Sequence, residues 1–117
     1  ANMAELATCP NVNIKVGGLG MRINGMGFET QAEPPSSDQL LTAWKPWMET
    51  TIELFGAGRC MFESNFPVDK TTASYGTIWN AFKRITASAS AAEKAALYAD
   101  VARKAYRLPV QVASAAP

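Results

Sequence analysis

The sequence predicts a single α/β domain in which short strands pair in parallel. One stretch, at about 11–16, alternates apolar and polar residues, and a second, at about 59–63, is a short apolar run. A long amphipathic helical segment separates them, and further helical segments follow the second strand. Strands that alternate with helices favour parallel pairing through a right-handed crossover. The 117 residues allow one ordinary domain.

The first element is predicted to be the end of a helix over residues 1–8 that begins upstream. Met3 and Leu6 are three residues apart, and Pro10 prevents the helix from continuing. The strand at 11–16 follows, with its β-branched residues facing one way. Residues 17–37 then hold five glycines and two prolines, which predicts a long loop. We interpret this loop as a lid or substrate loop, and the alternative is a disordered segment.

The central helix is predicted to begin at Ser36, because Gln39 three residues later completes a capping box. Its broad apolar face comprises Leu40, Leu41, Trp44, Trp47, Met48, Thr51, Ile52 and Phe55. Pro46 lies inside this pattern and is expected to kink the helix or divide it near 43–45. Gly56 and Gly58 are expected to end it before the second strand.

Two helices are predicted after the second strand. Tyr75, Ile78, Trp79, Phe82 and Ile85 recur at helical spacing and predict an amphipathic helix. Trp79 and Phe82, with Trp44 and Trp47 of the central helix, are predicted to belong to the core. A second capping box, at residues 90–93, opens a helix that runs to about residue 106. Residues 109–117 begin with proline, are rich in alanine and are predicted to be a flexible tail.

Charge and composition exclude several classes of partner. Eleven basic and ten acidic residues are interspersed and give a net charge of +1, which predicts binding neither to nucleic acid nor to an anionic membrane. No apolar run reaches the roughly 18 residues of a membrane-spanning helix. The N-terminus lacks a basic region and does not resemble a signal peptide. Two cysteines, Cys9 and Cys60, fit small buried side chains in a reducing cytoplasmic protein.

Polar residues directly after the second strand form the candidate site, because chemistry in α/β proteins gathers where parallel strands end. Asn65 either faces a pocket or caps the turn at Pro67. Glu63 and Lys15, from neighbouring strands, either contact substrate or pair with each other. Asp69 either reaches the pocket mouth or forms a solvated surface pair with the next residue, a lysine. The glycines after the first strand lack the spacing of a dinucleotide motif.

Three stretches of the chain resemble the amidohydrolase-2 group of TIM-barrel hydrolases, which includes lactone and 2-pyrone-4,6-dicarboxylate hydrolases. Asn11-Val-Asn-Ile-Lys-Val-Gly-Gly-Leu19 is similar to the group's Asn-Val-x-x-Lys-x-Ser-Gly-Leu. Phe55-Gly and Arg59-Cys-Met-Phe-Glu-Ser-Asn-Phe-Pro67 resemble its Phe-Gly-x-x-Arg-x-x-Phe-Gly-Ser-Asp-Trp-Pro. Ala102-Arg-Lys-Ala-Tyr-Arg-Leu108 looks like its closing helix.

The resemblance implies a partial (β/α)8 barrel: the last two β/α units plus a C-terminal helix, over residues 1–108. In the group, histidines from earlier strands hold a divalent metal, such as zinc in some relatives, or contact substrate, whereas this chain has no histidine. Asn65 stands where the group has an aspartate that binds metal or activates water, and an amide is no general base. Glu63 replaces a frequent glycine and Gly17 a frequent serine. We therefore expect no metal site within this chain.

Two functional hypotheses follow. In the first, the chain is the C-terminal segment of an amidohydrolase-like hydrolase acting on a lactone, ester or amide of a small carboxylated or sugar-derived compound. Asn65 would then be catalytic, and Lys15, Glu63 and Asp69 would bind substrate. In the second, the chain is a non-catalytic barrel fragment that self-associates into a homo-oligomer or completes a partner. Two parallel strands leave edges and apolar faces open, which favours such association.

Overall fold

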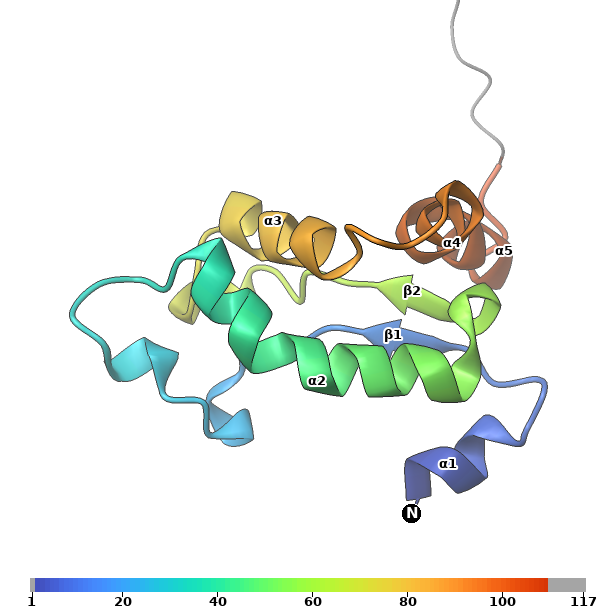
Figure 1. Ribbon diagram of the computed structural model, residues 1–117, viewed down its shortest axis with the longest axis horizontal. Coiled ribbons are helices and arrows are strands. Elements are labelled where there is room, and N and C mark those ends of the chain that lie inside the picture. Colours follow the sequence, from blue (N-terminus) through green and yellow to red (C-terminus); the bar gives the residue numbers. More distant parts are fainter. Residues whose placement is uncertain (1, 110–117) are drawn as a thin grey trace, which may run out of the picture.

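The computed structural model describes residues 2–109 and shows two short parallel strands with helices gathered around them (Figure 1). The expected flexible tail falls almost entirely on residues 110–117, which lie outside the described residues. The order of the main elements is α1 (Asn2–Ala7), β1 (Ile14–Val16), α2 (Ser37–Phe55), β2 (Cys60–Phe62), α3 (Tyr75–Ile85), α4 (Ala91–Ala95) and α5 (Val101–Ala105). The predicted alternation of strands and helices is therefore confirmed.

The two strands pair in parallel, as predicted. Ile14 lies opposite Cys60 and Val16 opposite Phe62, and the Glu63 N–H donates to Val16 O at 3.1 Å one step beyond β2. Both strands are shorter than the predicted 11–16 and 59–63. The reason is local: Val12 N–H bonds Cys9 O in a turn, and residues 57–59 form a 3₁₀ turn that joins α2 to β2.

Helix α2 runs without interruption from Ser37 to Phe55, so the predicted division near residues 43–45 is wrong. Its capping box at Ser36 and Gln39 is present, as predicted. Pro46 removes one backbone donor from the helix. The buried face on either side of it outweighs that loss, because Leu40, Trp44, Met48 and Phe55 all pack into the core.

The remaining helices follow the predicted order. The expected helix over about 90–106 is one continuous run made of α4, a π-helical turn η5 (Ala96–Asp100) and α5. Its capping box at Ser90 and Glu93 is confirmed. The predicted loop over residues 17–37 contains two short 3₁₀ turns, η1 (Arg22–Asn24) and η2 (Phe28–Thr30). None of the helices in residues 2–109 has the length and apolarity needed to cross a membrane.

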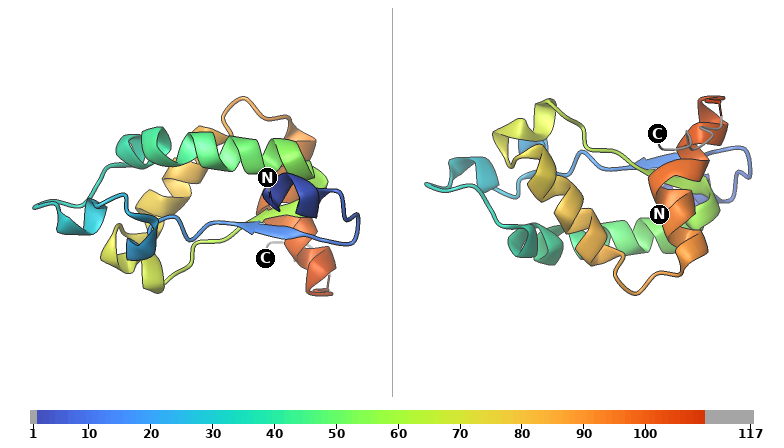
Figure 2. Two further views of the ribbon diagram at one scale, coloured as in Figure 1. Left: turned by 90° about the horizontal axis from the view of Figure 1, so that it is seen from below. Right: turned by 90° about the horizontal axis from the view of Figure 1, so that it is seen from above.

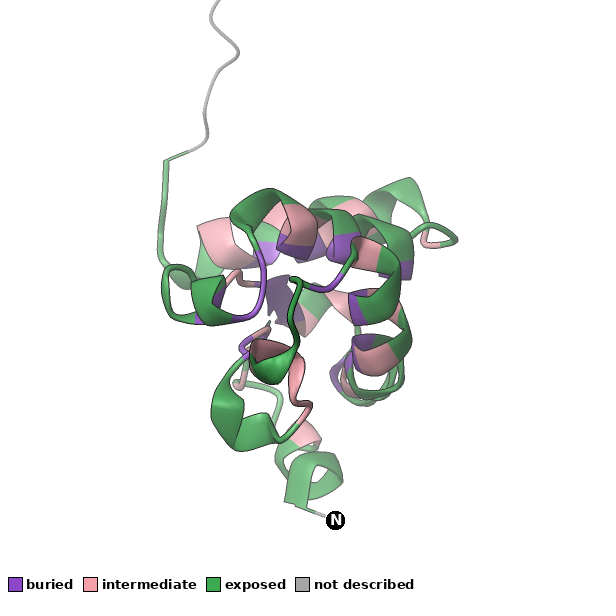
Figure 3. Ribbon diagram, turned by 90° about the vertical axis from the view of Figure 1, so that its left-hand side faces the viewer, coloured by how far each residue is buried: buried purple, intermediate pink, exposed green. Residues whose placement is uncertain are grey.

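Helices α2 and α3 lie beside the strand pair (Figure 2). The core lies between the strands and the helices, where the buried residues gather (Figure 3). Phe62 stacks on Phe82 with ring centroids 4.7 Å apart, and Trp44 lies 6.0 Å from Phe82. Trp47 was expected in this core but is 65% exposed. Only one stripe of α2 packs into the core, and Trp47 lies on the neighbouring stripe, beside α1 and the edge of β1.

Arg59 joins three elements at the amino ends of the strands. Its guanidinium donates to Ala7 O at 2.7 Å, Cys9 O at 2.8 Å and, through Nε, Phe55 O at 3.0 Å. These carbonyls lie at the ends of α1 and α2, where helices have no internal donors left. Both cysteines are free; Cys60 is buried, whereas Cys9 is exposed, so the expectation of a buried Cys9 is wrong.

Candidate functional site

The loops that follow β1 and β2 meet closely at the carboxyl ends of the strands. A Cβ on Gly17 would lie 2.2 Å from Glu63 O, so only glycine allows the backbones of the two loops to come this close. Gly18 adopts a left-handed conformation at φ +77°, which glycine adopts without strain. The loop then continues to Gly20, which packs against Asp69. The glycines after β1 thus serve close backbone contact.

Asp69 holds the two loops together. Its side chain is 1% exposed, Oδ2 accepts from Gly20 N–H at 3.2 Å, and Oδ1 accepts from Asn65 Nδ2 at 2.8 Å. The hydroxyl of Thr72 donates to Gly20 O at 2.7 Å and completes the connection. The expectation of a solvated pair with Lys70 is therefore wrong for Asp69, because its carboxylate is enclosed by the loop after β1.

Asn65 lies in the turn after β2, next to the cis Phe66–Pro67 bond, at φ 50°. Asparagine tolerates this left-handed conformation better than most residues. Its amide nitrogen is committed to Asp69, while its backbone carbonyl accepts from Asp69 N–H at 2.9 Å. The residue thus shapes the turn, and it is half-buried beside Gly18 and Glu63.

Glu63 and Lys15 do not form the ion pair that we considered. The ion pairs among residues 2–109 are Arg22–Glu29, Lys45–Glu49, Asp38–Arg84 and Asp100–Arg103. The Tyr106 hydroxyl, and after it the Glu63 carboxylate, raises the pKa of the Lys15 ammonium above its ordinary value. The Lys15 ammonium lies 5.9 Å from the centre of the Tyr106 ring. Successive side chains of a strand point to opposite faces, and Val16 is buried in the helical core. Lys15 is therefore exposed on the other face of β1.

The structure thus brings Glu63, Asn65 and Asp69 together and leaves Lys15 on the adjoining face of β1. Sequence reasoning missed Gly20, which donates to Asp69, and Thr72, whose hydroxyl donates to Gly20 O. Nothing in the local pattern around either residue indicates this role, because their partners are 49 and 52 residues away in the chain.

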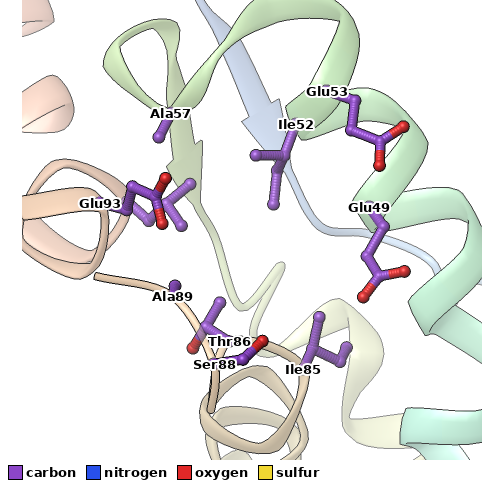
Figure 4. Close-up of a pocket in the computed structure, with 10 residues that line it drawn as sticks. Glu49, Ile52, Glu53, Ala57, Ile85, Thr86, Ser88, Ala89 and Glu93 are labelled. Atoms are coloured by element: carbon purple, nitrogen blue, oxygen red, sulfur yellow. The ribbon is translucent and has the colours of Figure 1, made fainter. Parts of the chain in front are cut away.

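A cavity of about 300 Å³ lies elsewhere, between α2, α3 and α4 (Figure 4). Glu49 and Glu53 of α2 and Glu93 of α4 border it, and Ile52 and Ile85 are among its apolar lining. The Glu93 carboxylate already accepts the Ser90 N–H of the capping box. This cavity lies on the helical face, and none of the residues at the carboxyl ends of the strands borders it. It is therefore not the candidate site.

The residues at the strand ends do not by themselves fit a metal. Both oxygens of Asp69 accept hydrogen bonds, and Asn65 turns its nitrogen toward that carboxylate. Within the described range 2–109, no three histidine, cysteine, aspartate or glutamate side chains are grouped so that they could hold a metal ion.

The fold and site define an α/β protein whose candidate site lies at the carboxyl ends of parallel strands. Comparison of its sequence with known proteins assigns the chain to a family. The family model described as amidohydrolase matches residues 1–108, and the chain belongs to this amidohydrolase family. The resemblance of the strand motifs is thereby confirmed.

Two relatives and two solved structures are similar to the chain. An uncharacterised protein of Sinorhizobium fredii, y4mH, is 42% identical over 106 residues, covering 91% of this chain and 31% of the relative. An L-fucono-1,5-lactonase of Burkholderia multivorans is 32% identical over 110 residues, covering 93% of this chain and 35% of the lactonase.

Crystal structures of an amidohydrolase from Burkholderia multivorans, one with bound HEPES and one with bound zinc, match with a TM-score of 0.75. They are 32% identical to the chain and cover 91% of it, and the match covers 35% of the solved chain. The chain therefore spans about a third of the length of the relatives that it matches.

Proposed function

We propose that the chain forms the C-terminal part of a barrel hydrolase that acts on a lactone, ester or amide of a small carboxylated or sugar-derived compound. The observation that carries this proposal is the position of Glu63 and Asn65, half-buried at the carboxyl ends of parallel strands. Barrel enzymes place their chemistry at that face. Membership of the amidohydrolase family and similarity to a lactonase support the reaction class.

The proposed roles follow from the chemistry of each side chain. Asn65 positions the attacking water or the substrate, and Glu63 is the carboxylate with access to that water. Lys15 supplies a positive charge for a substrate carboxylate. Asp69 acts through Asn65, because both of its oxygens already accept hydrogen bonds from the protein. The remaining groups of the site come from outside residues 2–109.

The test is hydrolysis of L-fucono-1,5-lactone by the full-length protein. Asn65→Ala is expected to lower kcat/KM by about 100-fold, the usual scale for one preorganised polar group. Lys70→Ala is the matched control, because Lys70 is exposed and lies close by in the same turn. Unchanged hydrolysis by Asn65→Ala would remove Asn65 from the mechanism.

A second candidate function is supported by a different surface. Met3, Pro46, Trp47 and Leu54 border an apolar groove of about 330 Å³ on α1 and α2, and Trp47 also borders the free edge of β1. In the part of the chain that the structure describes, β1 pairs with β2 alone. Exposed strand edges and apolar patches favour association. The alternative is thus a non-catalytic barrel piece that pairs with a second copy or completes a partner.

Sedimentation of the purified protein separates the alternatives. Self-association at micromolar concentration that is abolished by Trp47→Arg supports the second function. The control is Trp79→Arg, which disturbs the aromatic core and is expected to unfold the chain instead. A well-folded monomer would contradict the homo-oligomer. The apolar surface would then be expected to pack against the rest of the barrel.

A further inference from the structure

The orientation of the Asn65 amide decides which of its atoms a ligand meets. Nδ2 lies 2.8 Å from Asp69 Oδ1. The reverse orientation would place the amide oxygen against a carboxylate oxygen, with no hydrogen between them. Asp69 cannot turn away, because it is 1% exposed and its other oxygen accepts Gly20 N–H. The carboxylate therefore fixes the amide, and Oδ1 is the atom that remains available.

The available atom reaches solvent, and the Glu63 carboxylate contacts the same glycine as the Asn65 amide. Within residues 2–109 the buried side-chain nitrogen and oxygen atoms without a hydrogen-bond partner are Nε1 of Trp44 and Nε1 of Trp79, so neither Asn65 Oδ1 nor the Glu63 carboxylate is sealed in the core. Asn65 Nδ2 and Glu63 Oε1 each lie 3.7 Å from the point that a Cβ on Gly18 would occupy. The amide and the carboxylate thus flank Gly18 at the strand ends.

We propose that Asp69 is a positioning residue, and that it holds Asn65 so that Asn65 Oδ1 and the Glu63 carboxylate together accept hydrogen bonds from neighbouring hydroxyl groups of a sugar-derived ligand. This inference rests on the proposed function and narrows its substrate class. Two acceptors, one from each group that flanks Gly18, match a diol, which carries two donors. They repel a carboxylate, so a carboxylated end of the ligand belongs at Lys15 instead.

The first test measures hydrogen exchange of side-chain amides by NMR in the full-length, unmodified protein. The Nδ2 proton that Asn65 donates to Asp69 is expected to exchange about tenfold or more slowly than those of Asn11, because a hydrogen-bonded proton must be released before it exchanges. Asn11 is exposed and serves as the internal reference. Equal exchange at both residues would overturn the fixed amide.

The second test titrates the same protein with L-fucose, which carries hydroxyl groups, and with tetrahydropyran, which has the same ring without them. L-fucose is expected to shift the Asn65 side-chain resonance, and tetrahydropyran is not. A response to both, or to neither, overturns the diol site. Because this readout is binding, it is independent of hydrolysis: sugar binding without lactone turnover contradicts the proposed reaction alone.

The third test compares two variants of the same loop contact. Asp69→Ala frees the Asn65 amide and is expected to raise the dissociation constant for L-fucose about tenfold. Thr72→Val removes the other contact to Gly20 but leaves the amide fixed, so its dissociation constant should stay within about twofold. Equal losses would show that loop tethering, and not amide orientation, matters. If Asp69→Ala does not fold, the two measurements on the unmodified protein decide.

Discussion

The two ends of the parallel strand pair are each held by one charged side chain, but they are held with opposite chemistry. At the amino end, Arg59 donates to backbone carbonyls of residues up to 52 positions away in the chain. At the carboxyl end, Asp69 accepts from a backbone N–H of residue 20 and from the side chain of Asn65. One end is joined by a donor, and the other by an acceptor.

The contacts at the two ends differ in what they position: main-chain groups at the amino end and a side chain of the candidate site at the carboxyl end. The partners of Arg59 are all main-chain carbonyls, so this contact positions no functional group. Asp69 holds the Asn65 side-chain amide by its nitrogen and leaves the amide oxygen without a protein partner, and the amide and the Glu63 carboxylate flank Gly18. Parallel strands commonly divide their ends in this way, with stability at one end and function at the other.

The largest expected effect is at the amino end. Arg59→Ala should lower the free energy of unfolding by about 4 kcal/mol, because several carbonyls lose a charged donor together. Urea unfolding of the full-length protein measures it. Arg22→Ala is the control: its side chain is 84% exposed, and its ion pair should contribute less than about 1 kcal/mol. Equal effects of the two would show that Arg59 does not hold α1.

Stability should depend almost as strongly on the close contact between Gly17 and Glu63 at the carboxyl end. Gly17→Ala places a methyl group 2.2 Å from Glu63 O, a backbone atom, and should cost about 3 kcal/mol. Gly76→Ala, in the first turn of α3 with no atom within 4 Å of the new methyl, should instead stabilise by about 0.5 kcal/mol. Thermal unfolding measures both, and a tolerated Gly17→Ala would contradict the packing of the two loops.

The tether behind the site should have a smaller effect. Thr72→Val removes a buried hydroxyl that donates to Gly20 O at 2.7 Å, which should cost about 1.5 kcal/mol. Thr71→Val is the matched control, since Thr71 is exposed and its hydroxyl bond is 3.3 Å long. Faster protease cleavage of the loop over residues 17–37 would measure the loss of the Thr72–Gly20 hydrogen bond. Identical cleavage of the Thr72 and Thr71 variants would show that this bond does not hold the loop.

The smallest expected effect concerns the two thiols near the amino end. Burial, opposed by the Arg59 charge, raises the pKa of Cys60 to about 11. The unfolded chain loses this proton near pH 9 and the folded chain does not, so unfolding becomes easier as pH rises. The free energy of unfolding should fall by about 1 kcal/mol between pH 9 and 10, and Cys60→Ala should remove that part of the slope.

Alkylation gives an independent comparison of the same thiols. Iodoacetamide should modify Cys9, which is exposed, and spare Cys60 until the protein unfolds. Mass spectrometry of the labelled peptides measures this. Equal labelling of both cysteines in the folded protein would contradict the burial of Cys60.

Local patterns in the sequence determined much of the fold. The capping boxes at Ser36 and Ser90 follow from spacing within a few residues. The parallel pairing follows from the order of strands and helices along the chain. The location of the candidate site after β2 follows from the same patterns, because parallel strands end together. The family resemblance also rests on contiguous motifs.

Tertiary structure alone decided where the side chains go. Trp44 and Trp47 have the same spacing signal, yet one is buried and the other is exposed, because only one stripe of α2 packs into the core. Asp69 is enclosed because a loop from residue 20 reaches it across 49 positions of the chain. Sequence periodicity reports which face of an element is apolar, whereas burial and hydrogen-bond partners depend on which distant segment packs against that face.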